Sequence, residues 1–228
     1  SQAGNRKEGS RASLTESFAE IILAVKPLAF IMENVDRAEK SVSFASAKDM
    51  LSKGGYTLAH CVLDASKCGA PQKRKRLFCV GVKKSKYPKI TSEMILSELN
   101  ANVSSESLSV KEYFKHNKLT KHLEGVKYYY RHPRNYSRRG IFSIDEPSAT
   151  IRGVNRPVPS GYKGLIDPPG VSPKDVKPLS TKVRSLIQTF PESFEFNMPK
   201  TSAEQMIGNA VPVALAKHVA LAIVRLLK

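Results

Sequence analysis

Residues 28–36, LAFIMENVD, form the stretch that decides the fold class. Leu28 to Met32 is a continuous apolar run with the length of a buried strand, and it ends abruptly in polar residues that begin with Glu33 and Asn34. Open α/β sheets place their sites at the carboxyl ends of such strands. The stretch therefore predicts an α/β sheet with candidate site residues at Glu33 and Asn34.

The segments around this strand continue the pattern of an α/β sheet. Residues 14–25 carry apolar side chains at helical spacing and stop before Pro27, which predicts a helix. The next predicted elements are a helix over 41–53 and strands over 56–63 and 77–82. The order helix, strand, helix, strand, strand is that of the second half of an α/β sheet and not of a complete domain.

The chain changes character after about residue 89. Residues 92–125 are polar with weak periodicity, and residues 126–178 hold much of the Pro, Gly and Arg, with frequent turn signals. We interpret this stretch as a small, loop-rich, mainly β domain. Two further helices are predicted over 179–190 and 213–227, the second with a strong apolar face.

The net charge of +17 is concentrated in two windows of the 228-residue chain. Residues 67–89 contain nine basic and no acidic side chains, and residues 127–163 contain eight basic side chains against Asp145 and Glu146. Aromatic residues are interleaved with the second window, as expected of a surface that neutralises phosphates and contacts bases or sugars. The alternative for either window is a solvated Lys/Arg face.

Composition limits the class of protein further. At 41% hydrophobic residues the chain has the composition of a globular protein, and no stretch approaches the roughly 18 consecutive apolar residues of a membrane span. Its three cysteines lack Cys-x-x-Cys spacing, which argues against a disulfide framework and for a reducing compartment. These features favour a cytoplasmic protein with a polyanionic partner and no membrane contact.

A series of short motifs follows one order along the chain. The motifs are Arg11 to Leu14, Glu33-Asn34-Val35, Gly54-Gly55-Tyr56, Pro71-Gln72-x-Arg74-x-Arg76, Leu186 to Pro191 and Ile207 to Pro212. Each is weak alone, but in this order they resemble the DNA (cytosine-5)-methyltransferases over nearly all of the chain except residues 89–178. The resemblance implies the C-terminal part of a Rossmann-like S-adenosylmethionine-dependent methyltransferase sheet and a target-recognition module.

The implied division of the chain has three parts. A partial catalytic α/β domain covers residues 1–88, a target-recognition domain covers 89–192, and a C-terminal segment over 193–228 returns to the catalytic domain.

The resemblance also assigns catalytic roles. Carbon 5 of cytosine becomes nucleophilic after a thiolate adds at carbon 6, and that addition is easier when a carboxylic acid protonates N3 or donates a strong hydrogen bond to it. By resemblance Glu33 is this acid, and Arg76 holds it while contacting the base O2. Arg74 stabilises the catalytic loop or a phosphate, Gln72 shapes the same corner, and Asn34 orients the backbone around the site.

Simpler interpretations of these residues stay open. Glu33 could be a strand-end carboxylate paired with a Lys or Arg, and Arg74 and Arg76 could belong to a solvated basic turn. The Glu33 and Gln72 motifs begin 39 positions apart, bridged by a helix, Gly-Gly-Tyr and a strand, and this arrangement matches the family.

The methyl donor implied by the resemblance is S-adenosylmethionine, with no metal. The Gly-rich turn that holds most of this cofactor does not occur in the sequence, and the residues expected to contact it are Arg11, Leu14, Asn209 and Val211. Leu14 could instead be an ordinary core-facing helix residue, and Asn209 could cap the N-terminus of a helix.

Sequence recognition is expected from residues 127–163. Ala149 to Gly153 resembles the short Thr-Ile segment of the family's recognition region. Candidate contacts to duplex DNA are Arg138, Arg139, Thr150, Arg152 and Arg156, because Arg pairs bidentately with guanine. For any one of these arginines the alternative is phosphate binding.

The resemblance leaves the nucleophile unaccounted for. The family's cysteine belongs to a Pro-Cys dipeptide, whereas Cys61, Cys68 and Cys79 lie beside no proline. We expect that cysteine just upstream of Ser1, so that the chain needs a preceding portion or a complementary subunit and is inactive alone.

The leading hypothesis is a bacterial restriction-modification enzyme that methylates C5 of a flipped-out cytosine in duplex DNA. The alternatives are a non-catalytic DNA-binding or specificity subunit of a split methyltransferase and an RNA-methylating relative.

Overall fold

The computed structural model describes residues 13–133, 135, 137–164 and 166–228, and the chain forms two compact units. Unit 1 consists of residues 1–63, 75–102 and 219–228, and unit 2 consists of residues 64–74 and 103–218. Unit 2 thus joins residues 64–74 to residues 103–218. The coarse expectation of a mixed α/β fold is confirmed.

Unit 1 is built on a three-stranded sheet in the order β1-β4-β2. Its strands are β1 (Ala29–Val35), β2 (Tyr56–Asp64) and β4 (Lys75–Lys83), and β1 pairs antiparallel with β4. Its helices are α1 (Ser13–Val25), α2 (Val42–Lys53) and α3 (Ser92–Asn100), with a 3-10 turn η1 over Asp36–Lys40. The elements predicted over 14–25, 41–53, 56–63 and 77–82 are confirmed, with ends shifted by one or two residues.

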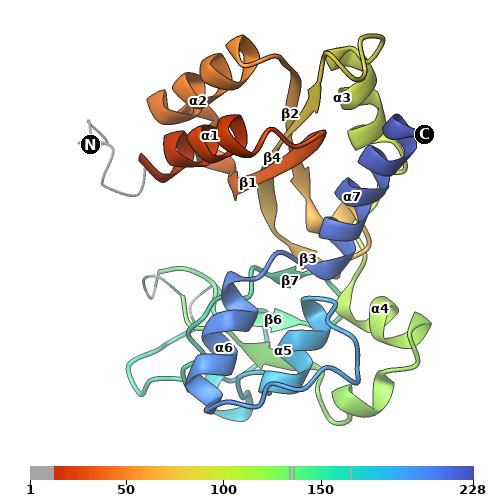
Figure 1. Cartoon of the computed structure of the whole chain (residues 1–228). Coiled ribbons are helices and arrows are strands. Elements are labelled where there is room, and N and C mark those ends of the chain that lie inside the picture. The colour runs from red at the N-terminus through yellow and green to blue at the C-terminus, as the bar shows by residue number, and fades with distance from the viewer. Residues whose placement is uncertain (1–12, 134, 136, 165) are drawn as a thin grey trace. The chain divides into compact units, whose positions relative to one another are not determined.

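Helices cover both faces of this sheet (Figure 1). Helices α1 and α2 pack on one face, where they form an apolar core with alternate residues of the strands, including Phe30, Met32, Leu77 and Cys79. Helix α3 and the last turns of α7 (Val213–Leu227) lie on the opposite side of the sheet in Figure 1, and Arg225 Nε contacts Glu98 Oε2 at 2.6 Å. Because both faces are covered, β4 is buried along most of its length.

A glycine fixes the packing between β1 and β4. Gly81 lies directly opposite Phe30 in the antiparallel register. A Cβ atom at position 81 would lie 2.2 Å from Cε1 of Phe30, so only glycine leaves room for this ring. The ring also makes an edge contact with Tyr56, with centroids 5.2 Å apart.

Unit 2 contains short strands and short helices. The strands are β3 (Gln72–Lys73), β5 (Tyr128–Tyr130), β6 (Ile141–Ser143) and β7 (Ser148–Ala149), which form the parallel pair β3-β7 and the antiparallel pair β5-β6. The α-helices are α4 (Val110–His116), α5 (Thr181–Ile187), α6 (Lys200–Asn209) and the first turns of α7, and the 3-10 turns are η2 (Ala65–Lys67), η3 (Thr120–Leu123) and η4 (Pro173–Asp175).

The expectation of a mainly β domain over 89–192 is wrong for the described residues. The strands there are β5, β6 and β7, of two or three residues each, whereas α3, α4 and α5 have seven to nine residues. Prolines limit strand pairing between residues 147 and 178 because each lacks a backbone N–H. Side-chain caps favour the helices: Ser109 accepts from the Glu112 N–H in a capping box, and Thr91 caps α3.

The core of unit 2 is made by helices α4, α5 and α6 together with strand and loop residues. Its members include Phe114, Tyr129, Ile151, Leu186 and Ile207, and each is buried. A smaller cluster surrounds Tyr130, Ile141 and Tyr162. The helix predicted over 179–190 is confirmed as α5, although it ends at Ile187 and Thr189 follows with a positive φ of 60°.

Residues 200–227 are long and apolar enough to cross a membrane by length and composition alone, with a mean hydropathy of 1.8 in an 18-residue window. They form two helices, α6 and α7, separated at Ala210 to Pro212. Helix α7 buries Leu215, Val219 and Ala222 completely. A core helix of a globular protein passes the same test, so this finding is weak evidence for a membrane span.

Candidate active site

Glu33 and Arg76 form an ion pair on neighbouring strands of unit 1. The Arg76 Nε lies 2.9 Å from Glu33 Oε1, and the Arg76 and Glu33 side chains are 15% and 33% exposed, respectively. The Arg76 Nη1 also donates to the Lys75 carbonyl at 2.7 Å, which orients the guanidinium plane. The pair thus combines a fixed guanidinium with a carboxyl group that solvent, or a ligand, can reach.

Strand register brings these two side chains together. Val35 is opposite Arg76 in the β1-β4 pair, and Glu33, two residues before Val35, shares its face of the sheet. Glu33 is therefore the diagonal neighbour of Arg76, within reach of a long side chain. The ion pair fits both interpretations of Glu33, the catalytic acid and the paired structural carboxylate.

The position of Glu33 relative to the strand corrects the expectation from sequence. Glu33 and Asn34 were expected just past the end of the strand, but β1 continues to Val35 and pairs Glu33 with Phe78 and Asn34 with Leu77. The strand continues because β4 offers backbone partners beyond the apolar run. Asn34 Oδ1 accepts from the Val35 N–H at 2.8 Å, so this side chain holds the backbone at the end of β1.

Gln72 is fully buried in unit 2 and bonds through both ends of its amide. Its Nε2 donates to Gln188 Oε1 at 2.8 Å, and its Oε1 accepts from the Ile151 N–H at 2.8 Å. Gln188 in turn donates through Nε2 to the carbonyls of Ile207 and Ala210. Gln72 therefore joins three segments that are far apart in the sequence.

Arg74 is buried as well, which excludes a solvated basic turn for this residue. It is 3% exposed, and its guanidinium donates from Nη1 to the Ile151 carbonyl and from Nη2 to the Gly208 carbonyl, both at 2.9 Å. Hydrogen bonds from a buried charge to carbonyls compensate for lost hydration. Arg74 and Gln72 belong to unit 2, whereas Glu33 and Arg76 belong to unit 1.

The residues expected at the cofactor differ in their environments where the structure describes them. Leu14, on the first turn of α1, is 64% exposed, so the alternative of a core-facing residue is wrong. Arg11 lies outside the described residues. Val211 is half-buried in the link between α6 and α7. Leu14 belongs to unit 1 and Val211 to unit 2, and each leaves apolar surface accessible within its own unit.

Asn209 differs from its expected position in a helix. It is the last residue of α6 and does not cap a helix N-terminus, and its Oδ1 accepts from Gln205 Nε2 at 3.2 Å. The helix was missed because residues 200–209 have weak amphipathicity and begin after Pro199 without a side-chain cap. Asn209 is exposed and can still contact a ligand.

The residues expected to contact DNA divide into two groups. Arg139 is partly exposed and is held by contacts within unit 2. It forms a two-pronged ion pair with Glu146 and donates from Nε to the Ile141 carbonyl at 2.7 Å. Its guanidinium also lies 4.6 Å from the centre of the Phe142 ring. Thr150 donates to the Lys73 carbonyl at 2.8 Å, and Arg152 donates to the His132 carbonyl. Each of these three side chains thus has a hydrogen-bond partner within unit 2.

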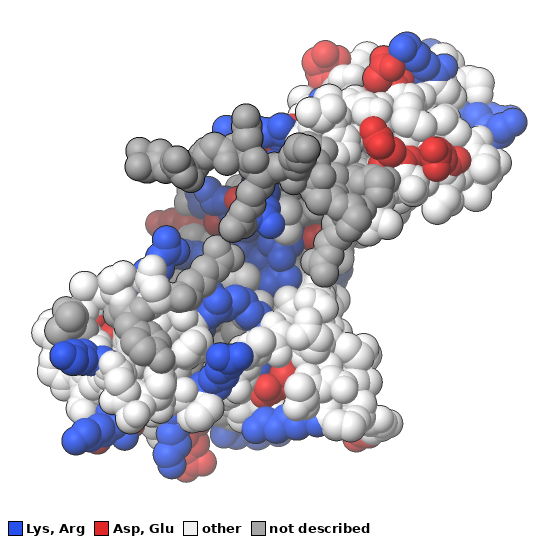
Figure 2. Space-filling view, turned by 90° about the vertical axis from the view of Figure 1, so that its left-hand side faces the viewer, with Lys and Arg blue, Asp and Glu red and all other residues white. Residues whose placement is uncertain are grey.

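Arg138 and Arg156 are exposed and form the second group. In Figure 2, Lys and Arg side chains form several separate blue patches among mostly uncharged residues on the lower part, which is unit 2. Arg152 and Arg156 also lower the pKa of His132, after the larger effect of its burial. This surface has the charge expected of a polyanion-binding face.

The three cysteines lack the properties of a nucleophile. Burial raises the pKa of the Cys61 thiol to about 11, with a smaller contribution from Glu39, and burial raises the pKa of Cys79 to about 12. Cys68 is buried next to the turn η2. A nucleophilic cysteine needs a lowered pKa and access to its substrate. Among the described residues no cluster of His, Cys, Asp and Glu could hold a metal ion.

Three functional candidates were missed by sequence reasoning. Gln188 bridges Gln72 to the carbonyl groups at the end of α6, and Arg184 forms a buried ion pair with Glu204. Gln188 lies within one of the ordered sequence motifs, but Arg184 and Glu204 lie in no short pattern. Only the packing of α5 against α6 brings them together.

Comparison with known proteins defines the class. Residues 1–225 match the family model of C-5 cytosine-specific DNA methylases, and the chain belongs to this family. It is 48% identical to the type II methyltransferase M.HindV of Haemophilus influenzae over 226 residues, which cover 98% of this chain and 71% of that protein. It is also 48% identical to M.HgiDI of Herpetosiphon aurantiacus, covering 95% of this chain and 66% of that relative.

Solved structures share the fold at low sequence identity. A DNA modification methyltransferase encoded within an E. coli prophage superposes with a TM-score of 0.62 at 18% identity, covering 97% of this chain and 76% of that one. The S. pombe Dnmt2 methyltransferase superposes with a TM-score of 0.55 at 15% identity, covering 88% and 67%. These likenesses support the methyltransferase-like fold.

Proposed function

We propose that this chain is the part of a type II DNA cytosine-5 methyltransferase that holds the target cytosine and reads the DNA sequence, in a bacterial restriction-modification system. The observation that carries the proposal is the Glu33–Arg76 pair, at 2.9 Å, in a chain that belongs to the C-5 cytosine-specific DNA methylases. The 48% identity to two type II methyltransferases supports the restriction-modification setting and a cytoplasmic location.

The pair has the chemistry needed to activate a cytosine. Glu33 is proposed as the group that protonates N3, or shares a proton with it in a strong hydrogen bond, while a thiolate forms a bond to carbon 6. The ring electrons then move to carbon 5, which takes the methyl group. Later loss of the carbon-5 proton, cleavage of the carbon–sulfur bond and return of the N3 proton restore the aromatic ring and free the thiolate. Arg76 fixes Glu33 and donates to the base O2.

Residues of this chain would contribute to a pocket for S-adenosylmethionine, which supplies an electrophilic methyl group when bound. Leu14 and Val211 offer apolar contact to an adenine, and the Asn209 carboxamide offers polar contact. Arg11 is proposed for the same role. The thiolate comes from a residue other than Cys61, Cys68 or Cys79, because these thiols are buried or have raised pKa values.

Unit 2 is proposed to bind duplex DNA and to act as the target-recognition module. Arg138, Arg152 and Arg156 are the arginines proposed to face DNA, with Thr150 and Arg139 shaping the surface beside them. The target cytosine must leave the base stack to reach a carboxyl group on β1. The three-stranded sheet is proposed as the C-terminal part of a Rossmann-like sheet, which agrees with the exposed apolar Ile31 and Val35 on its edge strand β1.

The test is methyl transfer with a supplied nucleophile. The chain is mixed with, or fused to, the portion of M.HindV that it does not match, and radioactive methyl incorporation into duplex DNA is measured. We expect incorporation into DNA cytosine with the mixture or the fusion and much less with either part alone. Methylation only of adenine, or only of RNA, would contradict the proposal.

A second candidate function is a DNA-binding specificity subunit in which Glu33 has no chemical role. The raised thiol pKa values of Cys61 and Cys79 favour it, since the chain then needs no nucleophile. Glu33→Gln in the mixture distinguishes the two functions: a specificity subunit keeps its turnover, whereas the catalytic function loses most of it with DNA binding retained.

A further inference from the structure

Residues 150–155 form a segment whose backbone is held by side chains. The segment follows β7 and has no regular secondary structure. Three side chains from two other segments bond its backbone: Arg131 Nε donates to the Thr150 carbonyl at 3.0 Å, Gln72 accepts from the Ile151 N–H, and Arg74 donates to the Ile151 carbonyl. Buried backbone groups outside helices and sheets require such partners.

Helices α5 and α6 hold the next part of the segment. Arg184, on α5, donates from Nη2 to the Arg152 carbonyl, and its Nη1 lies 3.1 Å from Glu204 Oε1 on α6. The two side chains are only 4% and 7% exposed. Desolvation lowers the pKa of Arg184, opposed by the charge and hydrogen bond of Glu204. Both charges are thus buried, and each depends on the other.

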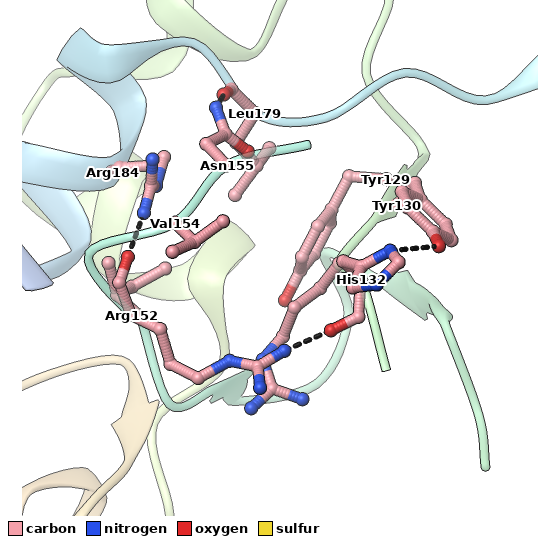
Figure 3. A pocket seen from close by; sticks show the side chains of 10 residues that line it. Tyr129, Tyr130, His132, Arg152, Val154, Asn155, Leu179 and Arg184 are labelled. Carbon is pink, nitrogen blue, oxygen red and sulfur yellow. Dashed lines mark hydrogen bonds between the residues drawn. The ribbon is translucent and has the colours of Figure 1, made fainter. Parts of the chain in front are cut away.

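Asn155 ties the far end of the segment to the same ion pair. Its Nδ2 donates to Glu204 Oε1 at 3.0 Å and to the Leu179 carbonyl at 2.9 Å. Thr181 donates to the same Glu204 oxygen at 3.0 Å. Figure 3 shows Arg184 directed at the Arg152 carbonyl and Asn155 directed at Leu179 around a small pocket.

A close backbone approach completes this arrangement. A Cβ atom at Gly208 would lie 2.0 Å from the Gly153 nitrogen and 2.2 Å from the Arg152 carbonyl carbon. Because these are backbone atoms, a side chain at position 208 would displace the segment from α6. Residues 150–155 are therefore fixed at both ends and in the middle.

We infer that Arg184 and Glu204 are positioning residues that set the DNA-sequence discrimination of the protein by fixing residues 150–155, which contain Arg152 and directly precede Arg156. This inference rests on the proposed function, because it requires that Arg152 and Arg156 face DNA. Neither charge of the pair contacts DNA itself. They act through the backbone carbonyl of Arg152 and through the amide of Asn155, and so they control where the two arginines point.

The test selects bound sequences from a random pool of duplex DNA, so the target sequence is an outcome of the experiment. Full chains of the natural protein, Glu204→Ala and Glu204→Gln are incubated with the pool, and the bound fractions are sequenced. We expect the natural protein to enrich one motif. Glu204→Ala should reduce discrimination at the most selective base pair by about tenfold, and total DNA binding should change less than about threefold. Glu204→Gln keeps an acceptor for Asn155 and Thr181 and should retain part of the discrimination.

A matched control separates positioning from general destabilisation. Ser109→Ala removes the cap of α4 in unit 2 without touching residues 150–156, and it should leave the motif unchanged. Should Glu204→Ala fail to fold, the double variant Arg184→Met/Glu204→Leu removes both charges and takes its place.

Failure of the proposed function and failure of the positioning role give different results in this experiment. A natural protein that enriches no motif would overturn the proposed reading of DNA and the inference with it. A natural protein that enriches a motif, with Glu204→Ala or the double variant enriching the same motif equally well, would overturn only the positioning role. Loss of the motif in Ser109→Ala as well would also contradict it, because the effect would then come from stability.

Discussion

The Glu33–Arg76 pair of unit 1 and residues 150–155 of unit 2 are both fixed in place, but by different means. Strand register places Glu33 beside Arg76, so regular backbone pairing determines that geometry. Residues 150–155 depend instead on side chains that include Gln72, Arg74 and Arg184, which bond single backbone groups. In the proposed function, a regular sheet thus holds the residues that activate the base, and an irregular segment whose backbone groups are held by single side chains lies in the module that reads the DNA sequence.

The comparison predicts that removing the acid of unit 1 has the largest effect on turnover. Glu33→Gln keeps the size of the side chain but cannot deliver a proton to N3, so we expect methyl transfer to fall by about 10²- to 10⁴-fold. DNA affinity, measured by fluorescence anisotropy, should stay nearly the same. Glu39→Gln is the matched control, because Glu39 is an exposed carboxylate of η1 in the same unit, and this variant should retain turnover. Equal turnover in both variants would remove Glu33 from the chemistry.

Breaking the buried Arg184–Glu204 ion pair of unit 2 should have the largest effect on the free energy of unfolding. Arg184→Leu leaves Glu204 buried without its cation and should lower the free energy of unfolding by about 3–5 kcal/mol. The double variant Arg184→Leu/Glu204→Leu should recover much of this loss, as measured by urea denaturation. If the double variant were as unstable as the single one, the ion pair would not be the cause.

Overpacking the sheet of unit 1 should have a smaller effect. Gly81→Ala forces a methyl group against Phe30 and should cost about 1–3 kcal/mol of unfolding free energy. The second substitution Phe30→Leu in the same chain should relieve part of that cost. Denaturation curves of the single and double variants measure both effects, and a neutral Gly81→Ala would contradict this packing.

Removing one exposed arginine should have a still smaller and purely electrostatic effect on DNA binding. Arg156→Gln should weaken binding several-fold and reduce the slope of log affinity against log salt concentration by about one, if Arg156 contacts a phosphate. Lys53→Gln, in unit 1, is the matched control because Lys53 pairs with Asp49 on the surface of α2. An unchanged salt slope for Arg156→Gln would exclude the phosphate contact.

The smallest predicted effect is the pH dependence that His132 confers. Its pKa is lowered from the ordinary value of 6.5 by burial and by Arg156 and Arg152, so the unfolded chain binds a proton more readily than the folded one. Stability should therefore fall as the pH drops below about 6.5 and level off below the folded pKa. His132→Asn should remove that part of the pH dependence in thermal melts; an unchanged profile would contradict it.

Sequence patterns predicted much of unit 1 because its elements are regular. Apolar spacing over 14–25 and the apolar run over 77–82 predicted α1 and β4 within one or two residues of their observed ends. Helix α4 was missed, although Ser109 and Glu112 form a capping box that can be read from sequence. Strand β1 was predicted too short because pairing with β4 extends it beyond its apolar residues.

The candidate site was predictable only where residue type and order carry the information. The motif order placed Glu33 and Arg76 in one site, and the strand register now explains their contact. Burial of Arg74 and the pairing of Arg184 with Glu204 could not be predicted, because they depend on how α5, α6 and β7 pack. Isolated charged residues in a basic chain resemble surface residues until their partners are known.

Activation of C5 of cytosine in duplex DNA is the chemistry on which the proposed function depends. The most direct measurement incubates the chain, completed with the unmatched portion of M.HindV, with duplex DNA and S-adenosylmethionine, and then identifies the modified nucleoside by mass spectrometry. We predict 5-methyldeoxycytidine, with about a hundredfold less or lower from Glu33→Gln. N4-methyldeoxycytidine, N6-methyldeoxyadenosine or equal yields from the natural chain and Glu33→Gln would contradict it.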